Sequence, residues 1–204
     1  MKATYLWQQG TEAWQKRLQL SETVGSFQAT AVIYGLDPEV GEVRGTLAKV
    51  FVSPFGRRFE IPNTNEVRLI LKEGGRLRTY RVDSASRTAQ VIEDTEAETA
   101  PQQGSSSVIA RSTERHRGFW CVVEQSRDSL NHSGVVLVSE AWTWTISAGP
   151  AKGWTLRGVI KMLSSEKLVY YTVWDTLELE FKTLPRDLFV IPRGYRIIKA
   201  GSSR

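Results

Sequence analysis

Short apolar runs separated by turn residues follow one another along the chain from Ser26 onwards. The last run, 177–182 (LELEFK), alternates strictly between apolar and polar side chains, as a half-buried strand does. The first, 27–34 (FQATAVIY), is rich in the β-branched and aromatic residues that strands favour. The pattern predicts about a dozen strands. They are expected at 27–34, 45–52, 55–61, 67–71, 77–82, 88–92, 118–124, 134–139, 142–146, 154–163, 168–174 and 177–182.

The connections between these runs are short and carry turn-forming residues. Lys72-Glu73-Gly74-Gly75 separates two apolar runs and is a strong hairpin motif. The chain shows no alternation of strands with helices, no heptads and no repeat of fixed period. We therefore expect a mainly β fold with an antiparallel sandwich or one highly curved antiparallel sheet, in a single domain spanning residues 1–204.

Two segments depart from the strand pattern. In 4–22, Trp7, Trp14 and Leu18 are spaced loosely enough to permit an amphipathic helix. Residues 93–107 (EDTEAETAPQQGSSS) are acidic and then polar, which predicts a mobile loop. A loop of this length inside a compact domain is either a functional cover or a plain linker.

Composition and charge narrow the classes of function. Apolar residues make up 41% of the 204 residues, enough for a packed core. No apolar stretch is long enough for a transmembrane segment, and no apolar run follows Met1-Lys2 as in a signal peptide. The 27 basic residues are scattered among 22 acidic ones, so the net charge of +5 indicates a mildly basic surface and no nucleic-acid partner.

The residues that usually carry catalysis or bind metals are scarce. Cys121 is the single cysteine, and His116 and His132 are the only histidines. The sequence therefore holds no disulfide framework, and we expect no metal and no cofactor. It lacks the glycine-rich phosphate loops and the nucleophile or zinc motifs of common enzyme families. We expect a non-enzymatic protein; an enzyme remains a third hypothesis, with Cys121 and His116 as its candidate residues.

The aromatic residues are the most informative feature. In Trp142-Thr143-Trp144, both indoles project from the same face of one strand, because side chains alternate along a strand. On the concave face of a curved sheet, such rings would line a groove for an acyl chain. One alternative is that the rings fill the core of a closed sandwich. Another is that they stack on RNA bases, but stacking on RNA requires basic residues interleaved with the rings.

Two stretches together resemble the periplasmic lipoprotein carrier (LolA) superfamily. The first, within 27–95, contains GTLAKVFVSPFGRRFEI followed by VRLILKEGGRLRTYRVDSASRTAQVIEDT. The second, LPRDLFVIPRGY at 184–195, is similar to the closing segment of that group. The resemblance implies a half-open β-barrel of about eleven antiparallel strands with one or two covering helices. It also implies the binding of lipid or lipoprotein acyl chains in the periplasm or cell envelope. The missing signal peptide leaves a cytoplasmic location as the alternative.

We therefore expect non-catalytic binding of acyl chains on the concave face, in envelope lipid or lipoprotein transport or sensing. The partners would be an acyl chain or a lipoprotein, with a membrane-anchored partner protein as a further candidate. The alternative is a protein-interaction or structural module that uses the same fold without a lipid. The candidate lining residues of the groove are Leu47, Phe51, Leu69, Leu71, Tyr80, Trp120, Trp142 and Trp144.

Overall fold

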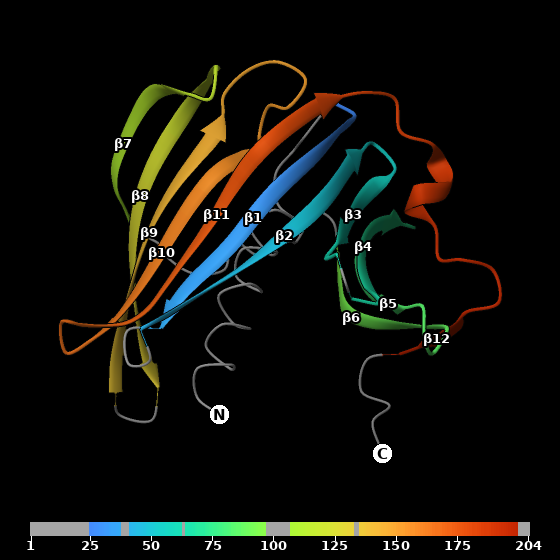
Figure 1. The fold of residues 1–204 in the computed structure, drawn as a ribbon, viewed down its shortest axis with the longest axis horizontal. Coiled ribbons are helices and arrows are strands. Elements are labelled where there is room, and N and C mark those ends of the chain that lie inside the picture. Colours follow the sequence, from blue (N-terminus) through green and yellow to red (C-terminus); the bar gives the residue numbers. More distant parts are fainter. Residues whose placement is uncertain (1–24, 38–40, 63, 97–106, 133–134, 200–204) are drawn as a thin grey trace. The chain divides into compact units, whose positions relative to one another are not determined.

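The computed structural model describes residues 25–37, 41–62, 64–96, 107–132 and 135–199. These residues form a mainly β fold with one open sheet, in the strand order β12-β6-β5-β4-β3-β2-β1-β11-β10-β9-β8-β7 (Figure 1). The elements are β1 (Phe27–Asp37), β2 (Glu42–Ser53), β3 (Gly56–Glu60), β4 (Glu66–Glu73), β5 (Arg76–Asp83), β6 (Thr88–Glu96), β7 (Ser107–His116), β8 (Phe119–His132), β9 (Val135–Ile146), β10 (Thr155–Ser164), β11 (Lys167–Phe181), the 3-10 helix η1 (Arg186–Phe189) and β12 (Arg196–Ile198).

Neighbouring strands are antiparallel wherever their register is defined, with one exception. The short β12 runs parallel to β6, with Arg196 opposite Thr88 and Ile198 opposite Gln90. The expected mainly β fold built on one antiparallel sheet is thus confirmed, with twelve strands in the described part of the chain. The predicted helix at 4–22 lies outside the described residues.

Several strands are longer than the sequence pattern indicated. The described residues of the runs 134–139 and 142–146 belong to the single strand β9, and the runs 168–174 and 177–182 merge into β11, which ends at Phe181. The predicted loop 93–107 is shortened at both ends, because β6 continues to Glu96 and β7 begins at Ser107. Residues 97–106 are not among those that the structure describes.

The described chain divides into two compact units. Unit 1 holds β7 to β10 with most of β11, and unit 2 holds β3 to β6, η1 and β12. Strands β1, β2 and β11 contribute residues to both units. Within the described ranges, no helix has the length and apolarity needed to cross a bilayer.

The core of unit 2 lies between its sheet and the C-terminal segment, which we define as residues 184–195. Side chains at alternate positions of β4, β5 and β6 share one face of the sheet, because Leu69 pairs with Tyr80 and Tyr80 with Val91. Leu184 and Phe189 of the C-terminal segment pack on this face and are buried. One face of the sheet is therefore covered by irregular chain rather than by a second sheet.

Candidate functional site

The eight candidate lining residues divide between the two units. Those of the N-terminal half of the chain belong to unit 2 and those of the C-terminal half to unit 1. The two sets are described separately: Leu47, Phe51, Leu69, Leu71 and Tyr80 in unit 2, and Trp120, Trp142 and Trp144 in unit 1.

In unit 2, four of the five candidates take part in the core under the C-terminal segment. Leu69, Leu71 and Tyr80 are buried there, and Phe51 packs against them. Leu47 lies on β2 four residues before Phe51 and is 49% exposed. In this structure the chain itself occupies the face that these residues form.

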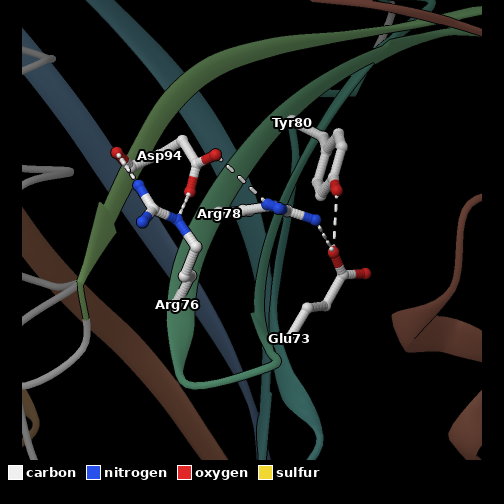
Figure 2. A network of polar contacts seen from close by, with 5 residues as sticks. All are labelled: Glu73, Arg76, Arg78, Tyr80 and Asp94. Carbon is white, nitrogen blue, oxygen red and sulfur yellow. Dashed lines mark hydrogen bonds and ion pairs between the residues drawn. The ribbon is translucent and has the colours of Figure 1, made fainter.

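Tyr80 also anchors a polar network at the edge of that core (Figure 2). Its hydroxyl donates to Glu73 Oε2 at 2.8 Å, and Arg78 donates to the same oxygen at 3.2 Å. Arg76 and Arg78 both donate to the carboxylate of Asp94, at 2.6 and 3.3 Å. Burial, followed by the bond to Glu73, raises the pKa of the Tyr80 hydroxyl. The network ties β4, β5 and β6 together, which is a structural role.

In unit 1, Trp142 and Trp144 lie on one face of β9 and are half-buried. The register places Trp142 opposite Val159 of β10, and Val159 opposite Val173 of β11. It places Val123 of β8 opposite Trp144. Directly paired residues share a face of the sheet. We call this side of the sheet the indole face: it holds Val123, Trp142 and Trp144, which are half-buried, and Val159 and Val173, which are buried.

Two cations lie over the rings of the indole face. The Arg157 guanidinium carbon is 5.5 Å from the centroid of Trp144, and the Lys161 nitrogen is 4.8 Å from that of Trp142. Both distances are within the range of a favourable cation–π interaction. Arg157 and Lys161 lie on the same strand, β10, and the register sets each opposite an acidic residue, Asp175 of β11 and Glu140 of β9 respectively. The face therefore combines apolar surface with charges of both signs.

Trp120 lies on the opposite side of the sheet from the other two tryptophans. In β8 it is Cys121 and Val123 that pair with Ile146 and Trp144, so Trp120, the residue before Cys121, faces the other way. Its side chain is 60% exposed. Sequence alternation could not reveal this, because it does not fix how two strands pair.

A polar cluster that the sequence pattern does not predict lies beside the indole face. We call it the turn cluster because the two-residue β7–β8 turn contributes to it. Arg117 in this turn has a φ of +48° and Gly118 a φ of +86°, as a type I′ hairpin requires. An Arg in a conformation that suits glycine costs about 1 kcal/mol. The members are Glu114, His116, Arg117, Trp144, Arg157 and Asp175.

The turn cluster is held by contacts between the β7–β8 turn and four strands, β7, β9, β10 and β11. Arg117 donates to Asp175 Oδ2 at 2.9 Å, across 58 residues of sequence. The Trp144 indole donates to Glu114, and the His116 ring lies 6.2 Å from that of Trp144. The register sets Arg157 between Trp144 and Asp175 on neighbouring strands. No sequence pattern indicates this assembly, since its members come from separate strands.

The environment of His116 keeps its imidazole neutral. Burial is the largest cause that lowers its pKa below the usual value. Asp175 and Glu114 act in the opposite direction, whereas Arg117 and Arg157 add to the lowering. A neutral ring leaves one nitrogen free to accept a hydrogen bond and the other to donate one.

Cys121 is a poor candidate for a nucleophile. The thiol is buried, and its burial raises its pKa. It donates a weak hydrogen bond to the Phe119 carbonyl at 3.7 Å. A reactive cysteine needs a lowered pKa and access to solvent. Within the described ranges, no group of His, Cys, Asp or Glu side chains could hold a metal ion.

Comparison with known proteins gives likenesses in fold only. No family model and no curated protein matches the sequence. A solved structure of an uncharacterized conserved protein from Thermus thermophilus is 13% identical, with a TM-score of 0.49, covering 93% of this chain and 99% of that one. Likenesses of this size do not identify a ligand or an activity.

Two further solved structures carry family names. A LolA superfamily protein from Nitrosomonas europaea is 12% identical, with a TM-score of 0.35 and coverage of 86% of this chain and 94% of that one. A putative outer membrane lipoprotein-sorting protein domain from Vibrio parahaemolyticus is 15% identical, with a TM-score of 0.39 and coverage of 90% and 97%. The solved structures that the chain resembles in fold thus include a LolA superfamily protein and a lipoprotein-sorting domain.

Proposed function

We propose that the protein binds an acyl chain, without catalysis, on the indole face of unit 1. The observation that carries this proposal is the half-buried pair Trp142 and Trp144 on one face, flanked by the valines of the neighbouring strands. An acyl chain gains about 0.8 kcal/mol for each CH₂ group removed from water, less the cost of ordering it. Such binding needs apolar area and no reactive group.

The biological setting is proposed on the sequence resemblance to the lipoprotein carrier superfamily. It supports a place in the periplasm or cell envelope, in lipid or lipoprotein transport or sensing. The ligand would be a lipid or lipoprotein acyl chain. The candidates Leu69, Leu71 and Tyr80 join this proposal only in a state in which the C-terminal segment has left the face that it covers.

Extraction of lipid from the purified protein and titration with a fluorescent fatty acid test the proposal. Native mass spectrometry should show a copurified mass that organic solvent removes. Trp144→Ala should weaken saturable binding about tenfold or more, since a central aromatic contact is worth more than about 1 kcal/mol. Trp120→Ala is the matched control, because this indole lies on the other face. The Trp120→Ala variant should bind the fatty acid with the same affinity as the unmodified protein. No saturable binding, or equal losses in both variants, would refute the proposal.

A second function, docking of a partner protein, is favoured by the edge strand β7. This strand ends the sheet, and Val108 and Ile109 are 53% and 52% exposed. An edge strand presents backbone groups that can pair with a strand of another chain. Ile109→Lys should abolish capture of such a partner and leave fatty-acid binding intact, and Trp144→Ala should do the reverse. Capture that survives Ile109→Lys would remove β7 from consideration.

A further inference from the structure

Three polar atoms of the turn cluster are fully buried and have no hydrogen-bond partner among the residues that the structure describes. They are His116 Nε2, Arg157 Nε and Asp175 Oδ1. A buried polar atom without a partner costs about 1–3 kcal/mol, and native proteins contain few of them. Three such atoms in one cluster therefore indicate a place where another molecule supplies the missing hydrogen bonds.

The chemical types of these atoms define what they can bind. Arg157 Nε–H is a donor only, and Asp175 Oδ1 is an acceptor only. His116 Nε2 accepts or donates according to the tautomer of the neutral ring. The complementary group must therefore offer both an acceptor and a donor, separated by a short distance. An amide does so, because its C=O accepts and its N–H donates.

The charges around the cluster favour a neutral group. Two arginines, Arg117 and Arg157, are balanced by the carboxylates of Glu114 and Asp175. Arg117 already pairs with Asp175 at 2.9 Å, and Glu114 accepts from the Trp144 indole. An anion would meet both carboxylates, and a cation would meet both arginines. A carboxylic ester is neutral but has no N–H for Asp175 Oδ1.

The position of the cluster connects it with the indole face. Trp144 belongs to both, and Arg157 lies over its ring. We propose that the turn cluster binds the amide group of an N-acyl ligand whose acyl chain lies along the indole face. The carbonyl oxygen accepts from Arg157 Nε–H, and the amide N–H donates to Asp175 Oδ1. This inference rests on the proposed function and adds the headgroup chemistry.

Displacement of a bound fluorescent fatty acid by two isosteric neutral ligands, with dodecanoate as a third and anionic ligand, tests the inference. N-methyl dodecanamide and methyl dodecanoate have the same chain and differ by N–H against O at one position. The amide should bind the unmodified protein about tenfold more tightly, the difference expected for one buried hydrogen bond to a charged group, because only the N–H distinguishes the two ligands. In Asp175→Leu, which removes the acceptor for this N–H, the preference should fall to about twofold or less.

Lys161→Met is the matched control for this variant. Lys161 is likewise a charged residue beside the indole face, on the strand next to that of Asp175, but it has no contact with the turn cluster among those that the structure describes. This variant should keep the tenfold preference for the amide. Circular dichroism should show that both variants retain the sheet. Where a variant fails to fold, the relative affinity of the unmodified protein for the amide and the ester still tests the amide assignment.

The possible outcomes separate the inference from the proposed function. Equal affinity for amide and ester in the unmodified protein would overturn the amide assignment while acyl-chain binding stands. Tighter binding of dodecanoate than of either neutral ligand would overturn it in favour of an anion. Failure of all three ligands to displace the probe would refute both proposals. An equal loss of preference in Lys161→Met would remove the assignment to the turn cluster.

Discussion

Replacement of Phe189 by alanine tests whether the C-terminal segment seals the apolar face of unit 2. Phe189 is 4% exposed and packs in the core with Leu69 and Tyr80. A buried phenylalanine removes about 150–200 Å² of surface from water, and its truncation to alanine costs about 3–5 kcal/mol in well-packed cores. We therefore expect the free energy of unfolding to fall by about 3 kcal/mol or more.

Besides the packing of its apolar side chains, few polar contacts among the described residues link this segment to the rest of the chain. Arg58 donates to the Leu188 carbonyl at 3.2 Å, and the Leu184 amide donates to Ser26 Oγ at 3.3 Å. A hydrogen bond contributes only about 1 kcal/mol net. Phe189→Ala should therefore also increase hydrogen exchange in the segment itself, because local release becomes easier than global unfolding.

Urea denaturation followed by circular dichroism is the suitable assay for this variant. The tryptophans that the structure describes all lie in unit 1, so their fluorescence would report on the wrong unit. Val190→Ala is the control, because Val190 is the next residue and is 44% exposed. It should change the free energy of unfolding by less than about 0.5 kcal/mol. A loss in Phe189→Ala as small as that in Val190→Ala would refute the packing argument.

Three further predictions concern single sites. Gly56→Ala should destabilise by about 2 kcal/mol or more in urea denaturation, because φ is +153° and a Cβ would lie 2.6 Å from the Ile70 carbonyl oxygen; Gly74→Ala, with open space around it, should cost about 1 kcal/mol. Burial lowers the pKa of His116, so its contribution to stability is complete above the unfolded-state pKa of about 6.5 and is lost as the pH falls from there through the lower pKa of the folded state. An NMR titration should give a His116 midpoint below this value, and a midpoint above it would contradict a pKa lowered by burial. The Cys121 thiol should react slowly with a disulfide reagent in the native protein and completely in urea; fast native reaction would show that it is accessible.

The strand content was predictable because apolar alternation and turn residues are local signals. β7 was not predicted, since all its residues but His116 are exposed and its sequence SVIARSTERH lacks an apolar side. It is a strand only because it pairs with β8 along the sheet edge. The largely acidic residues 93–96 (EDTE) likewise belong to β6 because they pair with β5, where Arg76 and Arg78 neutralise Asp94.

The candidate site was predictable in part. The shared face of Trp142 and Trp144 follows from alternation within one strand, and the pairings of β9 agree with it. Whether Trp120 joins them depends on the register between strands, which alternation does not encode. That Leu69 and Tyr80 are covered by residues 184–195 depends on a contact between the middle and the end of the chain. The turn cluster was missed for the same reason.

The C-terminal segment has a consequence for the order in which the protein can fold during synthesis. Strands β4 to β6 leave the ribosome well before Leu184 and Phe189, which bury their apolar face, have been made. Local hairpins form within microseconds, so these strands can pair long before their cover exists. Until then the nascent chain presents Leu69 and Leu71 to water and to its neighbours. The growing polypeptide thus passes through a period of aggregation risk that ends only when the C-terminal segment has been made.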